Sequence, residues 1–187
     1  MTSPVSRRTF SHKNSSDRTV MTIEHDFFGI LGSDDAAEVY WSDSAELGDQ
    51  DVQIDLSSPD EESVSAEALD IAAAMVNDIE ELDSQARESL VADLSKEGSV
   101  TGAYITTELD EMDPEVLDDA LIWDSGDKQI DFLRSIQLQR IGFHPHHFRS
   151  EEHFAVLEYS ISPDDTDALL VVTIDVHGDP VLIAVEQ

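Results

Sequence analysis

The sequence lacks cysteine altogether, has only three lysines and contains no long apolar run. The absence of cysteine excludes structural disulfides, a thiolate nucleophile and cysteine-ligated zinc. No stretch approaches the roughly 20 consecutive apolar residues that a membrane-spanning helix requires. Ser6–Phe10 contains two adjacent arginines, as twin-arginine export signals do, but the apolar region of about 7–15 residues that such signals need does not follow. We therefore predict a cytoplasmic protein without a membrane span.

Acidic residues dominate the charge. The chain has 42 Asp and Glu against 10 Lys and Arg among 187 residues, a formal net charge of −32. From Met21 onward, 6 basic residues stand against 41 acidic ones. Such a surface repels nucleic-acid phosphates and anionic lipids, so neither is an expected partner. A basic protein is the partner that this charge favours, although adaptation to salt or a GC-rich genome produces the same composition.

The chain divides into a short basic stretch and one longer acidic region. Residues 1–20 are predicted to be a disordered basic tail, or to result from an upstream choice of start codon, because Met21 is a natural start for the folded part. Residues 21–187 are predicted to form a single acidic domain. About 167 residues suit one hydrophobic core, and apolar residues make up 40% of the chain.

Alternating residues predict strands on the N-terminal side of this domain. Val52, Ile54 and Leu56 alternate with polar residues, which is the pattern of a half-buried antiparallel strand over Asp51–Leu56. Two further strands are expected before it, at His25–Leu31 and Glu38–Trp41.

The period then changes to that of helices. Ser58 to Glu61 combines an N-cap, a proline at the first helical position and a capping glutamate. Ser63 and Ser65 are rival N-caps for the same helix. The expected helical segments have an apolar stripe from Leu69 to Leu82, and then cover Ser84–Glu97, Val100–Leu109, a short helix that opens at Asp113-Pro114, and a turn or two over Asp127–Leu133.

The final third is predicted to be a β-meander. His177 to Pro180 make a tight hairpin turn, in which Gly178 supplies the positive φ. The order of strands, helices and strands favours an α+β fold: an antiparallel sheet from the N-terminal strands and a four-stranded meander, with a central block of three to five helices packed on one face. The meander strands are expected at Ile136–Phe143, Phe154–Ile161, Ala168–Val176 and Val181–Val185.

Two segments carry a resemblance to a known family. They are the acidic helix pair IAAAMVNDIEELDSQARESLVADL and the meander LQRIGFHP…FAVLEYSIS…DALLVVTIDVHGDPVLIAVE. Over roughly residues 22–187 the chain resembles a bacterial family, domain-of-unknown-function family two thousand and four. The resemblance implies a bacterial, cytosolic protein with the fold just described. It brings no catalytic residue, because none is established for that family.

Four of the seven histidines gather in one predicted connection between strands: His144, His146, His147 and His153. Neutral imidazoles with a carboxylate bind Zn²⁺ or Ni²⁺, so these four are candidate metal ligands. A solvated histidine-rich loop is the alternative interpretation, and no His-Glu-x-x-His helix is present. In so acidic a protein, nearby carboxylates are expected to raise the pKa of these imidazoles.

The other patterns predict no catalytic residue and no cofactor site. Acidic runs such as Asp110–Glu115 lack the spacing of a calcium loop, so solvated faces and turns account for them. The sequence has no Gly-x-Ser-x-Gly elbow and no glycine loop of the phosphate-binding types.

Two tryptophans are candidates for an interface. Trp41 and Trp123 are expected either to pack into the core or, if exposed among acidic residues, to anchor a partner. The acidic net charge and the candidate interface tryptophans together favour a non-enzymatic, acidic protein-binding module, such as an immunity-type or regulatory inhibitor of a basic partner. The alternatives are a small metal-binding protein or metal-dependent enzyme that uses the His144–His153 loop, and a structural protein that dimerises through a sheet edge.

Overall fold

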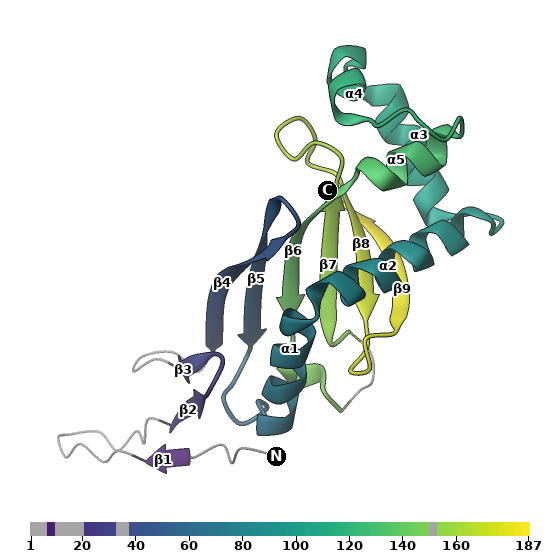
Figure 1. Ribbon diagram of the computed structural model, residues 1–187. Helices are drawn as coiled ribbons and strands as arrows, with labels where there is room; N and C mark the ends of the chain where they lie inside the picture. The colour runs from purple at the N-terminus through teal and green to yellow at the C-terminus, as the bar shows by residue number, and fades with distance from the viewer. Residues whose placement is uncertain (1–6, 10–20, 33–37, 150–152) are drawn as a thin grey trace.

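A six-stranded sheet forms the centre of the computed structural model, which describes residues 7–9, 21–32, 38–149 and 153–187. Its strand order is β4-β5-β6-β7-β8-β9, and a separate sheet has the order β1-β2-β3 (Figure 1). The strands are β1 (Arg7–Thr9), β2 (Met21–His25), β3 (Gly29–Leu31), β4 (Val39–Leu47), β5 (Gln50–Ser58), β6 (Gln137–Phe143), β7 (Ala155–Ser160), β8 (Leu169–Ile174) and β9 (Pro180–Glu186).

Five α-helices connect β5 to β6, and this long crossover allows those two strands to run parallel. In Figure 1, α1 and α2 cross one face of the six-stranded sheet, whereas α3, α4 and α5 lie beyond the ends of its strands. The α+β prediction, a mostly antiparallel sheet with helices packed against it, is confirmed. The helices are α1 (Ala66–Asn77), α2 (Ile79–Leu94), α3 (Val100–Glu111), α4 (Pro114–Ala120) and α5 (Lys128–Ser135), and a 3₁₀ turn, η1 (Pro145–His147), follows β6.

The sheet face under α1 and α2 carries the hydrophobic core. Val52, Ile54 and Leu56 of β5 are fully buried on that face, as the alternation predicted. Asp51 and Gln53 lie on the opposite face and are exposed. The burial of a continuous apolar stripe is the main force that holds the helix pair on the sheet.

The opposite face of the sheet holds a charge cluster. Arg140 of β6 binds both carboxylate oxygens of Asp55 on β5, at 2.9 Å for the Nη2–Oδ2 pair, and also binds Glu158 of β7 through Nη1 at 2.7 Å. Asp55 is only 2% exposed. One arginine therefore compensates two carboxylates that the strand order brings together.

The structure chooses among the helix starts. Ser65 is the N-cap of α1, and its hydroxyl accepts a hydrogen bond from the Ala68 N–H at 3.1 Å. Ser58 instead ends β5, and its hydroxyl donates to the Asp60 carbonyl. Of the three caps considered, the one nearest the apolar stripe is used, because the residues between Ser58 and Ser65 turn the chain from the sheet onto its face.

The break between α1 and α2 lies at Asp78, so the predicted boundary between Leu82 and Ser84 was wrong. The Asp78 N–H bonds to the carbonyls of Ala74 and Met75, and α2 begins at the next residue, Ile79. The apolar stripe runs unbroken across the bend, because Ile79 and Leu82 are both buried. Periodicity alone therefore could not locate the bend.

The structure also bears on three smaller predictions, which concern the turn at Gly178, the N-terminal tail and a membrane-spanning helix. Gly178 has φ +86 in the predicted turn between β8 and β9. Within the predicted tail, Arg7–Thr9 form β1 and pair with β2, while the other residues of 1–20 lie outside the described part of the chain. Among the described residues, no helix has the length and apolar character needed to cross a membrane.

Candidate functional site

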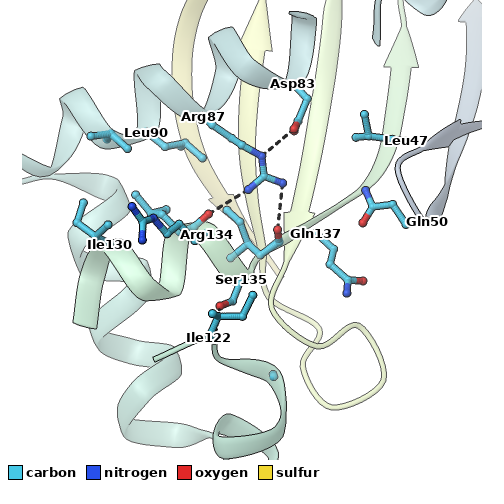
Figure 2. Close-up of a pocket in the computed structure, with 14 residues that line it drawn as sticks. Leu47, Gln50, Asp83, Arg87, Leu90, Ile122, Ile130, Arg134, Ser135 and Gln137 are labelled. Atoms are coloured by element: carbon cyan, nitrogen blue, oxygen red, sulfur yellow. Dashed lines mark hydrogen bonds and ion pairs between the residues drawn. The ribbon is translucent and has the colours of Figure 1, made fainter. Parts of the chain in front are cut away.

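A hollow of about 760 Å³ lies where α2, α5 and the β4–β5 turn meet. Its volume is within the range of ligand-binding cavities. Figure 2 shows Leu90 and Arg87 on one side, Ile122 and Ser135 below them, and Leu47 with Gln50 across the opening. Most of the lining is apolar: Leu47, Leu90, Val91, Ala120, Ile122, Ile130, Leu133 and Ile136.

Arg87 is the central polar group of the hollow. Its Nε donates to Asp83 Oδ2, one turn earlier in α2, at 2.8 Å. Its Nη1 and Nη2 donate to the backbone oxygens of Leu133 and Ile136, each at 3.0 Å (Figure 2). The guanidinium thus satisfies carbonyls at the C-terminal end of α5, which a helix leaves without internal partners, and holds α5 against α2.

Asp83 connects Arg87 to the hydrophobic core. Its second oxygen, Oδ1, accepts a hydrogen bond from the Tyr159 hydroxyl of β7 at 2.9 Å. Burial, and then the Asp83 charge, raise the pKa of Tyr159 well above its ordinary value. The guanidinium carbon of Arg87 also lies 5.3 Å from the centre of the Tyr159 ring. Arg87, Asp83 and Tyr159 at the base of the hollow therefore interact with one another, and these interactions fix the shape of the hollow.

The rim of the hollow exposes large apolar side chains. Val91 and Ile122, which line the hollow, are 47% and 59% exposed, and Trp123, the residue after Ile122, is 46% exposed. Ile122 lines the hollow, and its N–H donates to the Ser135 hydroxyl at 2.9 Å, which fixes the backbone after α4. The Lys128 ammonium lies 5.8 Å from the centre of the Trp123 ring.

Acidic residues flank Ile122 and Trp123 in the sequence. Asp118, Asp119, Asp124 and Asp127 lie within five residues of Trp123, and all four are exposed. Asp124 pairs with Arg134 at 2.8 Å on the surface, while Asp127 caps the first turn of α5. We call Ile122, Trp123 and these four aspartates the Trp123 rim.

Trp41 has a different environment from Trp123. Its ring packs edge-on against Phe28, with ring centres 4.8 Å apart, and it is partly buried against the core. The two tryptophans that the sequence proposed for an interface are thus separated: Trp41 packs where β2–β3 approach β4, and Trp123 remains on the surface.

The four loop histidines do come together in space. The ring centres of His146 and His147 are 4.1 Å apart, those of His144 and His146 are 5.9 Å apart, and those of His147 and His153 are 6.4 Å apart. Nevertheless, within the part of the chain that the structure describes, no group of three or more His, Asp or Glu residues is arranged to hold a metal ion. The zinc or nickel site stays a prediction, which metal analysis of untagged protein would check.

The expected direction of the histidine pKa shifts was wrong for two of these residues. Burial lowers the pKa of His144, and the neighbouring His146 and His147 lower it further. Burial and the adjacent histidines likewise lower the pKa of His147. Close imidazoles and lost hydration outweigh the carboxylates, because the charge of the whole protein is spread over a large, solvated surface.

Sequence reasoning missed the hollow itself. Arg87 resembles any charged residue on the outer side of an acidic helix, and its role depends on carbonyls that lie 46 and 49 residues later in the chain. One local signal was available: Ile122 and Trp123 form an apolar pair outside the stripe of the helix before them.

No family model matches the chain, and no curated protein or solved structure matches it. The resemblance noted from the sequence therefore stays a prediction.

Proposed function

We propose that this protein is a non-enzymatic module that binds a basic protein through the hollow and the Trp123 rim. One observation carries the proposal: Ile122 lines a mostly apolar cavity, Trp123 follows it in the chain, both are about half exposed, and four exposed aspartates lie within five residues of Trp123 in the sequence. The proposed role is that of an immunity-type or regulatory inhibitor.

The chemistry of this surface suits protein recognition. Binding energy at interfaces concentrates in a few aromatic and apolar anchors that a polar rim shields from water. The hollow offers a partner space for an apolar side chain, and Trp123 offers the partner an anchor in return. Most polar groups at the base already have internal partners, so a ligand gains little from them.

Charge supplies the other half of the recognition. With 41 acidic and 6 basic residues from Met21 onward, the domain carries a net negative charge that attracts a positively charged surface. Complementary charge accelerates association and excludes acidic competitors, while the apolar anchors set how long the complex lasts. The expected partner therefore has a basic surface around an exposed apolar side chain.

The test compares two double variants, each of which replaces two exposed apolar residues with serine. The Ile122→Ser/Trp123→Ser variant removes the proposed anchor, and the Val181→Ser/Leu182→Ser variant removes two similarly exposed apolar residues from β9. Each immobilised protein is exposed to lysate of its own source at about 0.05 and 0.5 M salt, between which charge screening increases strongly. A captured protein is then purified and titrated against all three forms by calorimetry.

We expect a basic protein that is captured at low salt, and an affinity that falls at least tenfold in the Ile122→Ser/Trp123→Ser variant alone. Equal affinity of all three forms would contradict the proposed site. Loss of affinity only in the β9 variant would place the interface on the far edge of the sheet and overturn the proposal as well.

A further inference from the structure

A second cavity, of about 510 Å³, lies at the C-terminal end of α3 and is lined by acid. It is bordered by the end of α3, the start of α4, the loop between β7 and β8, and Gln187. Among the residues that the structure describes, no lysine, arginine or histidine lines it. Five carboxylates contribute to the wall: Glu108, Glu111, Asp113, Asp165 and Asp167.

Glu108 distinguishes this cavity from an ordinary acidic surface. Glu108 is 3% exposed, although most of the Asp and Glu residues that the structure describes are exposed. One hydrogen bond links it to Thr166, but its Oε2 is buried and has no hydrogen-bond partner in the described part of the chain. A buried carboxylate oxygen without a partner is costly, and native proteins rarely leave one so.

The environment of Glu108 also disfavours its charged form. Burial raises the pKa of Glu108, and the charge of Glu111 raises it further. The described structure places no cationic side chain in the cavity wall to offset this effect. A positively charged ligand would supply both the missing donor and the missing charge.

The shape of the cavity indicates which kind of cation fits. Its volume far exceeds that of a single ion, and no group of three carboxylates in the described chain is arranged to hold a metal. Met112, Val116 and Ala168 give the wall an apolar part next to the acids. A methylene chain packs on such a surface while its charged end reaches a carboxylate, as lysine side chains do.

We propose that this cavity binds an alkylammonium group, with the ammonium donating to Glu108 and its methylene chain packed on Met112 and Val116. Two sources share this chemistry: a lysine side chain of a protein and a free diamine. An ammonium has three donors, enough for Glu108 and two further oxygens of the wall. This cavity is separate from the hollow at Arg87, so the inference does not rest on the proposed function.

The experiment titrates the full chain with cadaverine, with the tripeptide acetyl-Gly-Lys-Gly-amide and with methylammonium, each by calorimetry at constant ionic strength. Glu108→Gln keeps the size of the side chain and removes its charge. Glu88→Gln, on an exposed position of α2, removes the same charge elsewhere and is the matched control. Circular dichroism verifies the fold of each variant, and Glu111→Gln is a second variant at the cavity wall.

We expect one cadaverine or lysine peptide per chain, bound at least tenfold more weakly by Glu108→Gln, less affected by Glu111→Gln, and unchanged in Glu88→Gln. Cadaverine alone would identify a small-molecule site, and binding of the peptide would identify a site for a protein lysine. Methylammonium is expected to bind more weakly than either, because it has no methylene chain. Equal losses in Glu108→Gln and Glu88→Gln, or binding of calcium chloride in place of the amines, would overturn the proposal.

Discussion

The helices divide into two groups that differ in where they lie relative to the six-stranded sheet. α1 and α2 lie across the six-stranded sheet, and their inner residues, such as Leu69 and Ala86, are fully buried. α3, α4 and α5 lie beyond the strand ends, are shorter on average and carry the exposed Ile122 and Trp123 on their connection. We call the first group with the sheet the scaffold, and the second the outer block.

Both cavities lie where the outer block meets the scaffold. The hollow at Arg87 has α5 as one wall, and the cavity at Glu108 has α3 and α4. The scaffold buries the inner stripe of α1 and α2 against the sheet, and its exposed apolar residues, such as Val181 and Leu182, lie on the edge strand β9. The outer block has no sheet beneath most of it, and its incomplete packing leaves apolar surface and unpartnered polar groups available for recognition.

The largest expected effect comes from arginine in the scaffold. Arg140→Ala leaves the buried Asp55 carboxylate without its counter-charge and should lower the free energy of unfolding by about 3 kcal/mol, because an uncompensated buried charge is costly. Arg134→Ala, in the outer block, breaks an exposed pair with Asp124 and should cost ~0.5 kcal/mol or less. Urea denaturation of both variants gives the comparison. Similar losses for the two would show that the cluster around Arg140 is no better shielded from water than a surface pair.

The second-largest expected effect tests the contact between the scaffold and the outer block. Arg87→Met keeps much of the apolar stem and removes the bonds to the carbonyls of Leu133 and Ile136, for an expected loss of about 2 kcal/mol. The loss should be local, with faster amide exchange over α5 and unchanged protection in β7 and β8. Hydrogen exchange followed by mass spectrometry measures this. Uniform acceleration through the sheet would mean that the outer block and the scaffold unfold as one unit.

A smaller contrast comes from two helix caps. Ser65→Ala removes the N-cap of α1 and Asp127→Ala removes that of α5, and each cap contributes about 1 kcal/mol to its helix. Since α1 belongs to the scaffold, Ser65→Ala should lower global stability by that amount. Asp127→Ala should mostly increase exchange within α5. If Asp127→Ala lowers global stability as much as Ser65→Ala does, the distinction between the two regions is wrong.

Sequence patterns predicted those parts of the scaffold whose physics is local, whereas the single strand expected over His25–Leu31 was wrong, because the chain turns there between β2 and β3. The alternation of Val52, Ile54 and Leu56 and the hairpin at Gly178 depend on neighbours in the chain, and the structure has both. The cavities could not be predicted, because they join distant segments. Arg87 needs the end of α5, and the environment of Glu108 needs the β7–β8 loop some 60 residues later. The parallel β5–β6 pair, too, depends on where the whole helical crossover returns.

Titration should act in opposite directions at the two ends of the sheet. His144 follows the last residue of β6, at the end away from α5, and burial and neighbouring histidines lower its pKa. The unfolded state therefore takes up a proton near pH 6.5 that the folded state does not, so stability is full above this pH and falls as pH decreases toward the folded pKa. The raised pKa of Glu108 has the opposite effect: protonation favours the folded state, and stability increases as pH decreases through that pKa.

The smallest expected effect is the separation of these two contributions by urea denaturation at pH 7.5, 6.5 and 5.5. Relative to the wild type, His144→Asn should lose less stability on acidification, because it removes a group that resists protonation when folded; Asp55, Arg140, His146 and His147, which also act on His144, remain in both proteins. Glu108→Gln should gain less stability than the wild type over the same range. The asparagine variant losing more than the wild type would show that the histidine cluster is stabilised by protonation. In that case the carboxylates that lie around the loop in sequence, rather than the partial burial of His144, would determine how this end of the scaffold responds to acid.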